Sequence, residues 1–164
     1  MRNIAVVIPA RLNSTRIKHK MLKKFGDEPL IRIVFDKVRM MGFDTFVATD
    51  SKRIAKHIPI KWCIQTGKAD NGTHRLSKRA VLDLVSGYDY ILNIQGDMID
   101  INHETIKPGY HPYMLKAYRT MKDKYKSENL EQNRILANYD IEVIETKYNG
   151  IEINTEADLN SWKL

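Results

Sequence analysis

The stretch that decides the fold is residues 4–22, which read IAVVIPARLNSTRIKHKML. Its first five residues, Ile4 to Ile8, are continuously apolar, as in a strand buried inside a parallel sheet. A short loop with arginine, lysine and hydroxyl side chains follows. In open α/β sheets, ligands bind in the crevice beyond the carboxyl ends of the strands. We therefore expect a strand that leads into a loop able to grip a multiply charged anion such as a triphosphate.

Several residues of this loop are suited to phosphate. The cationic and hydroxyl donors are Arg11, Ser14, Thr15, Arg16, Lys18 and Lys20. Composition alone leaves a second interpretation open, because a run of charge is commonly a solvated basic loop without a ligand. The order of the residues therefore matters more than their number.

The rest of the first hundred residues alternates between strand-like and helix-like patterns. Strands are predicted at Ile4–Ile8, Thr45–Ala48, Ile60–Gln65 and Tyr90–Ile94, and helices at Pro29–Met41, Ser51–His57 and Thr73–Val85. Such alternation predicts an α/β fold: a Rossmann-like, mainly parallel sheet with helices on both faces. We expect residues 1–164 to form a single domain, because 164 residues with 43% hydrophobic side chains suffice for one core.

Beyond residue 102 the pattern is mainly helical. We expect helices over His103–Lys107, Pro112–Lys126 and Asn129–Asn138, and then a strand at Ile141–Glu145. A final helix over Glu156–Trp162 would begin after a cap at Asn154 or Thr155.

Charge and composition restrict the function. The net charge of +7 and the pI near 9.4 raise nucleic-acid binding as an alternative, but no motif organises the basic residues for it, so we expect no nucleic-acid partner. No apolar run is long enough for an export signal or a membrane span, which predicts a cytoplasmic protein with no membrane partner. The single cysteine, Cys63, cannot form an internal disulfide and is expected to pack in a strand.

The order Pro-Ala-Arg-x-x-Ser-Thr-Arg from Pro9 onward resembles the nucleotide-binding signature of the CMP-Kdo synthetases, the 3-deoxy-manno-octulosonate cytidylyltransferases. Further blocks follow in that family's order: Ala48-Thr49-Asp50, Gly72-Thr73-His74-Arg75-Leu76, Asn93-Ile94-Gln95-Gly96-Asp97, Glu104-Thr105-Ile106, Glu128 to Arg134, and Asn154 to Leu159.

The resemblance implies a nucleotide-diphospho-sugar transferase-like fold and an enzyme that transfers CMP from CTP to a Kdo-like sugar acid, with Mg²⁺ as cofactor and release of pyrophosphate. The nucleotide-binding residues that it implies are Ala10, Arg11, Ser14, Thr15, Arg16, Lys20, Asp50, Gly72, Thr73, Arg75 and Gln95. It implies catalytic roles for Arg11, Lys20 and Asp97, and it places Mg²⁺ at Asp97 and Asn154.

The residue types and their positions agree with these roles, but they also allow purely structural roles. Asp97 follows an apolar strand and would project a carboxylate over the strand's end, where a hard cation can bind. An aspartate after a strand is also common as a turn residue. Because such a carboxylate is expected to be exposed, Asp97→Asn should leave the fold intact. Gly72 and Thr73 stand at a predicted helix start, which suits either the nucleoside or a simple cap.

Three departures from the family limit the transfer of function. Asn154 replaces an aspartate, so magnesium binding should weaken unless Glu152, on the same strand face, substitutes. His19 replaces a glycine, and its β-carbon disfavours a positive φ, so the loop is expected to follow a different path. Residues 107–127 are a shortened replacement of the segment that carries acceptor and dimer contacts in the family.

Two alternatives to CMP transfer onto a Kdo-like acid therefore stay open. One is a cytidylyltransferase for a different acceptor, and the other is a catalytically weak CTP-binding protein. The shortened segment also predicts a monomer or a homodimer unlike that of the family.

Overall fold

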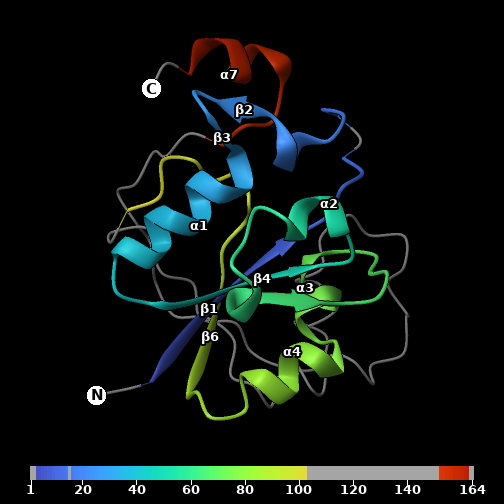
Figure 1. The fold of residues 1–164 in the computed structure, drawn as a ribbon, viewed down its shortest axis with the longest axis vertical. Helices are drawn as coiled ribbons and strands as arrows, with labels where there is room; N and C mark the ends of the chain where they lie inside the picture. The colour runs from blue at the N-terminus through green and yellow to red at the C-terminus, as the bar shows by residue number, and fades with distance from the viewer. Residues whose placement is uncertain (1–2, 15, 103–151, 163–164) are drawn as a thin grey trace, which may run out of the picture.

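The four strands of the parallel sheet in the computed structural model lie at the centre of the molecule. The structure describes residues 3–14, 16–102 and 152–162. The parallel sheet has the order β5-β4-β1-β6 (Figure 1). Its members are β1 (Ile4–Ala10), β4 (Asp44–Thr49), β5 (Cys63–Gln65) and β6 (Tyr90–Asn93). The α/β fold and the parallel pairing are thus confirmed. The elements expected between residues 103 and 151, including the 107–127 replacement, lie outside the described residues.

Strand β1 is one of the two inner strands of this sheet, and its side chains enter two cores. It pairs with β4 from Ala5 opposite Asp44, and with β6 from Ile4 opposite Tyr90. Because side chains alternate along a strand, Val6 and Ile8 enter one hydrophobic cluster while Ala5 and Val7 enter the other. Burial on both faces explains the unbroken apolar run at the start of the sequence.

Helices cover both faces of the sheet, as expected. Helix α1 (Leu30–Met40) buries Ile31, Val34 and Val38 in the cluster that contains Val6 and Ile8. On the other face, α3 (Gly72–Leu76) contributes Leu76 and α4 (Arg79–Leu84) contributes Val81. The two apolar faces therefore use different helices.

The single helix predicted over Thr73–Val85 is wrong, because the backbone breaks between α3 and α4. Lys78 is extended, with φ −65° and ψ 142°, and serves as the N-cap of α4. Helix α3 is capped by Asn71, whose side chain accepts a hydrogen bond from the backbone N–H of His74 at 2.7 Å. The apolar spacing continues across the break and so conceals it.

Two shorter segments also differ from the prediction. The strand expected over Ile60–Gln65 begins only at Cys63, because Ile60–Trp62 form a 3-10 turn in which Ile60 is 93% exposed. Helix α2 (Lys52–Ala55) is one turn long and is capped by Ser51. A hairpin of β2 (Lys24–Phe25) and β3 (Glu28–Pro29) was not predicted, since two-residue strands leave no periodic pattern.

The carboxyl-terminal segment returns to the sheet. Helix α7 (Glu156–Ser161) begins at Thr155, one of the two caps expected, and lies beyond the carboxyl ends of the strands beside β2 and β3 (Figure 1). The carboxylate of Asp158 accepts the backbone N–H groups of Asn154 and Thr155, which lowers its pKa below the usual 3.8. This stabilisation is therefore present at neutral pH and is lost as the pH falls through the lowered pKa. Ile153 is fully buried in the core beside α1.

Gly96 lets the turn after β6 pack closely against the side chains of Met21 and Ile31. A β-carbon at Gly96 would lie 2.7 Å from Sδ of Met21 and 3.3 Å from Cδ1 of Ile31. We predict that Gly96→Ala lowers the free energy of unfolding by about 1–3 kcal/mol, as overpacking a close-packed core does. Gly67→Ala is the control, because nothing lies within 4 Å of its β-carbon position. Equal urea midpoints for the two variants would contradict this steric role.

In the part of the chain that the structure describes, no helix is both long and apolar enough to traverse a lipid bilayer.

Candidate active site

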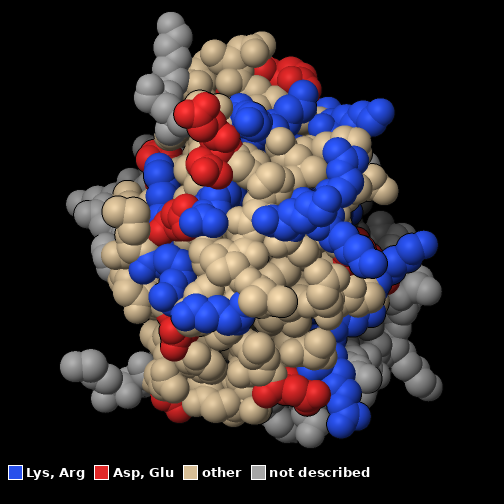
Figure 2. Space-filling model, in the orientation of Figure 1, with Lys and Arg blue, Asp and Glu red and all other residues tan. Residues whose placement is uncertain are grey.

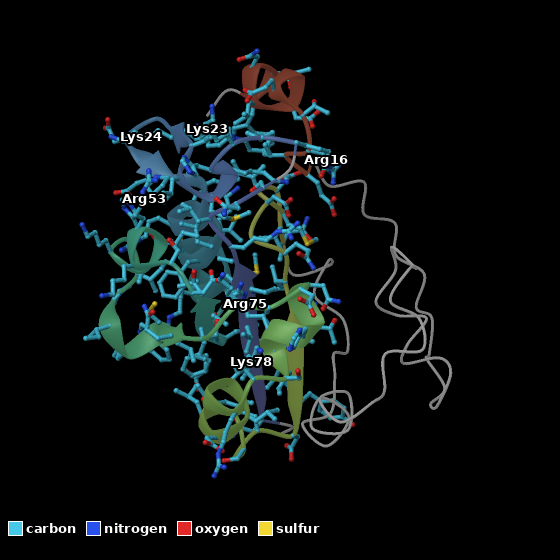
Figure 3. The ribbon with its side chains drawn as sticks, turned by 90° about the vertical axis from the view of Figure 1, so that its right-hand side faces the viewer. Arg16, Lys23, Lys24, Arg53, Arg75 and Lys78 are labelled. Atoms are coloured by element: carbon cyan, nitrogen blue, oxygen red, sulfur yellow. The ribbon has the colours of Figure 1, made fainter. Side chains whose placement is uncertain are left out.

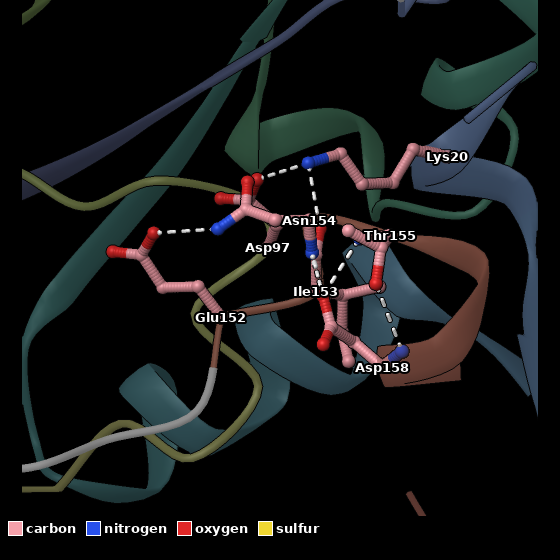
Figure 4. A network of polar contacts seen from close by, with 7 residues as sticks. All are labelled: Lys20, Asp97, Glu152, Ile153, Asn154, Thr155 and Asp158. Carbon is pink, nitrogen blue, oxygen red and sulfur yellow. Dashed lines mark hydrogen bonds and ion pairs between the residues drawn. The ribbon is translucent and has the colours of Figure 1, made fainter. Parts of the chain in front are cut away.

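Lys20 stands at the centre of the candidate site. It opens the 3-10 helix η1 (Lys20–Leu22) and is only 6% exposed. Its ammonium group donates hydrogen bonds to Oδ2 of Asp97, with which it forms an ion pair, and to the carbonyl oxygen of Ile153 at 2.7 Å (Figure 4). We call this contact the Lys20–Asp97 pair. With the Ile153 carbonyl it joins three segments that are far apart in sequence: the loop after β1, the turn after β6 and the residues before α7.

Asp97 is fixed by its backbone as well as by Lys20. Its carbonyl oxygen accepts the N–H groups of Ile99 at 3.0 Å and Ile153 at 3.1 Å. Its side chain is 16% exposed, so the carboxylate lies in a partly desolvated position. Within the described residues, its second oxygen, Oδ1, has no hydrogen-bond partner. One carboxylate oxygen is therefore paired and the other is available.

Asn154 and Glu152 lie next to this pair. The side-chain amide of Asn154 donates to Oε2 of Glu152 at 3.1 Å (Figure 4). This leaves the amide oxygen of Asn154 without a partner in the described chain. Carboxylate and amide oxygens are the hard donors that Mg²⁺ prefers, so Asp97, Asn154 and Glu152 fit that ion chemically. The described residues nevertheless contain no group of three acidic, histidine or cysteine side chains suited to a metal.

The loop arginines predicted to bind phosphate are free to do so. Arg11 and Arg16 are exposed and make no hydrogen bond or ion pair within the described parts of the chain. Ala10, at the end of β1, is buried, Ser14 is half-buried, and Thr15 lies outside the described residues. The loop therefore offers unpaired guanidinium groups directly after β1.

Other cations surround the same end of the molecule. Arg16, Lys23, Lys24 and Arg53 lie near the end that carries α7, whereas Arg75 lies nearer the middle (Figure 3). A run of Lys and Arg side chains also crosses the face over α2 (Figure 2). Lysine and arginine side chains thus gather near the carboxyl edge of the sheet, which favours an anionic ligand.

His19 adopts the left-handed conformation, with φ 54° and ψ 38°. The loop therefore takes a positive φ at this position despite the β-carbon, contrary to the preference from which a change of path was expected. Desolvation, and then the charges of Arg53, Lys18 and Lys23, lower the pKa of His19 below its usual 6.5. The imidazole is therefore mainly neutral at pH 7.

We predict that His19→Gly raises the free energy of unfolding by about 1 kcal/mol, because glycine adopts the left-handed conformation without strain. The larger backbone entropy of glycine in the unfolded chain offsets part of this stabilisation. Lys18→Gly is the control, since His19 is the one non-glycine residue with a positive φ in the described chain. It should be destabilising in the same urea titration. A less stable His19→Gly protein would show that the strain is absent.

Asp50 and Arg75, which are both predicted to bind the nucleotide, form a second cluster. The guanidinium of Arg75, which is 3% exposed, lies 3.2 Å from Oδ2 of Asp50 and donates to Oγ1 of Thr66 at 2.6 Å. Thr73 is fully buried in α3 and Gly72 is half-buried at its start. The structure therefore brings Asp50 and Arg75 together in a mutual contact that holds the edge of the sheet against α3.

The remaining predicted residue, Gln95, is exposed directly before Gly96. Its position beyond β6 leaves the side chain free to reach a ligand. Sequence reasoning selected Lys20 and Asp97 separately, for phosphate and for metal, and missed their direct contact. It also missed the carbonyl of Ile153 and the steric role of Gly96, neither of which has a side-chain signal.

Comparisons with known proteins agree with this architecture. The family model described as "Cytidylyltransferase" matches residues 5–152. A 3-deoxy-manno-octulosonate cytidylyltransferase of Francisella tularensis subsp. tularensis (strain FSC 198) is 37% identical over 101 residues, which cover 59% of this chain and 40% of that protein. The protein of the same name from Rickettsia typhi (strain ATCC VR-144 / Wilmington) is 37% identical over 110 residues, covering 64% and 46%. The matched part thus spans less than half the length of these curated relatives.

Solved structures share the fold. A CMP:2-keto-3-deoxy-manno-octonic acid synthetase complexed with CTP superposes with a TM-score of 0.72 at 19% identity, covering 96% of this chain and 95% of the other. The bifunctional IspDF from Campylobacter jejuni gives a TM-score of 0.72 at 14% identity, covering 96% and 53%. At these identities the likeness concerns the arrangement of the chain.

Proposed function

Since this chain belongs to the cytidylyltransferase family, we propose that it transfers CMP from CTP to a Kdo-like sugar acid and releases pyrophosphate. The observation that carries the proposal is the Lys20–Asp97 pair with Asn154 next to it (Figure 4), together with two loop arginines that have no partner among the described residues. The names of the curated relatives support CTP and the sugar acid as substrates.

The proposed reaction is a displacement at the α-phosphorus of CTP. An oxygen of the acceptor forms a new bond to this phosphorus, and the bond from the α-phosphorus to the bridging oxygen of the β-phosphate breaks. Pyrophosphate leaves with the bond's electron pair, and the acceptor hydroxyl releases a proton. Arg11, Arg16 and Lys20 would hold the phosphates and neutralise the charge that gathers on the leaving group. Positioning and charge neutralisation supply most of the catalysis in such a transfer.

We assign the magnesium ligands to Asp97 and Asn154, with Glu152 within reach as a second carboxylate. A bound Mg²⁺ would supply additional positive charge at the phosphates. Asn154 contributes an oxygen without charge, and Lys20 already neutralises Asp97. This arrangement also favours the second candidate, a CTP-binding protein with weak catalysis.

The nucleoside side is proposed to lie over Gly72, Thr73 and Gln95, with Asp50 and Arg75 shaping its wall. Ala10, Ser14 and Thr15 would line the path between nucleoside and phosphates. Hydrogen bonds to a base edge discriminate strongly, because a mismatched base leaves polar groups unpaired.

We predict that the protein binds CTP in the presence of Mg²⁺ at least about tenfold more tightly than ATP or GTP, a difference of about 1.4 kcal/mol. Isothermal titration calorimetry with the three nucleotides at one magnesium concentration measures this difference directly. All three nucleotides carry the same triphosphate, so they control for the phosphate contribution. Equal affinities would contradict the assignment of the nucleoside side.

A further inference from the structure

The Lys20–Asp97 pair places a cation on the carboxylate that the proposed function assigns to the metal. Lys20 is buried and its ammonium is held by Oδ2 of Asp97 and by the carbonyl of Ile153 at 2.7 Å. The ammonium and the carboxylate cancel each other's charge. A divalent cation that approaches Asp97 therefore meets a pair without net charge, and the ammonium of that pair repels it.

The ammonium group of Lys20 can also donate a hydrogen bond to a phosphate oxygen. A lysine ammonium has three N–H donors, and in the described structure two of them are used, by Asp97 and by Ile153. The third is available to an incoming anion. Arg11 and Arg16 precede Lys20 in the same loop and have no partners in the described residues, so they offer further donors to such an anion.

We propose that Lys20 is an internal counter-cation of Asp97 that a polyphosphate draws away, so that metal and nucleotide bind to this chain in a coupled manner. In the nucleotide-free protein Lys20 keeps the metal affinity of Asp97 low. When the phosphates arrive, the ammonium moves its charge to them and the carboxylate becomes free for the cation. By linkage, a metal that binds Asp97 raises the affinity for the polyphosphate by the same factor.

The proposal rests on the proposed function, because that function identifies the anion as a polyphosphate. The effect of Lys20 on metal binding, however, is tested without any nucleotide. Mn²⁺ serves as the probe, because its free concentration is read from its electron paramagnetic resonance signal. We expect weak Mn²⁺ binding by the wild-type protein and at least tenfold tighter binding by Lys20→Gln. Glutamine removes the charge and keeps an N–H donor for the carbonyl of Ile153.

Three matched variants make this comparison specific. Lys24→Gln applies the same change to an exposed lysine four residues away, and Lys20→Arg keeps the charge, so both should bind Mn²⁺ within about twofold of the wild type. The double variant with Asp97→Asn and Lys20→Gln should lose the tighter Mn²⁺ binding. This loss would assign the tighter binding to the carboxylate of Asp97. Equal Mn²⁺ affinity in the wild type and Lys20→Gln, or a gain that persists with Asp97→Asn, would overturn the proposal.

A measurement on the wild type covers the case in which Lys20→Gln fails to fold. The proposal has saturating Mn²⁺ replace the Lys20 amine at Asp97, which frees the amine for acetylation by an N-hydroxysuccinimide ester. Peptide mass spectrometry should show the acetylation of Lys20, relative to Lys24, rising at least threefold with Mn²⁺. An unchanged ratio would overturn the proposal. A protein that passes these tests yet shows no preference for CTP would contradict only the proposed function.

Discussion

Asp97→Asn is expected to lower the free energy of unfolding by about 3 kcal/mol, because it leaves the buried ammonium of Lys20 without its counter-charge. The side chains of Lys20 and Asp97 are 8% and 16% exposed, so water can compensate only in part. This result differs from the sequence-based expectation that the substitution leaves the fold intact. That expectation assumed an exposed strand-end carboxylate, and the structure shows a carboxylate inside an ion pair.

A double-mutant cycle separates the pair from the effects of each side chain. The double variant with Lys20→Met and Asp97→Asn should be no less stable than Asp97→Asn alone, because no uncompensated charge remains. We expect a coupling energy of about 1–3 kcal/mol from urea unfolding. Asp27→Asn, the same change at an exposed turn, should stay within about 0.5 kcal/mol of wild type. Additive losses in the two single variants would mean that the pair contributes nothing.

The second large effect concerns turnover. Asp97→Asn is expected to reduce the rate of CTP-dependent pyrophosphate release by at least about 10²-fold, because a charged contact made in the transition state is lost. The assay belongs at a temperature at which circular dichroism shows the variant fully folded. Asp27→Asn is again the control and should keep wild-type turnover. A wild-type rate in folded Asp97→Asn would exclude Asp97 from the reaction.

The fold could be predicted where a local pattern and the tertiary structure agree. The apolar run from Ile4 to Ile8 indicated a strand buried on both faces, and β1 is an inner strand of the sheet. The pattern misled where a backbone break leaves the apolar spacing intact, as at Lys78 between α3 and α4. It also misled at Ile60, where an alternating sequence after Pro59 forms a 3-10 turn with its side chain in solvent.

The candidate site was predictable as a set of residues but not as a set of contacts. Lys20 and Asp97 are 77 residues apart, and Lys20 and Ile153 are 133 apart. No local signal links positions at that separation, because the contact is created by the closing of the chain around the sheet. The mutual contact of Asp50 with Arg75 has the same origin. The conformation of His19 could not be predicted for a different reason, because its left-handed backbone is one that its residue type disfavours.

The most direct test of the central claim is a pyrophosphate-release assay with the wild-type chain, CTP, Mg²⁺ and 3-deoxy-manno-octulosonate. We expect release that requires all three, that falls when ATP or GTP replaces CTP, and that yields the CMP-linked sugar acid in equal amount. A chain that binds CTP but releases no pyrophosphate above background with this acid would contradict the assignment as a sugar-acid cytidylyltransferase.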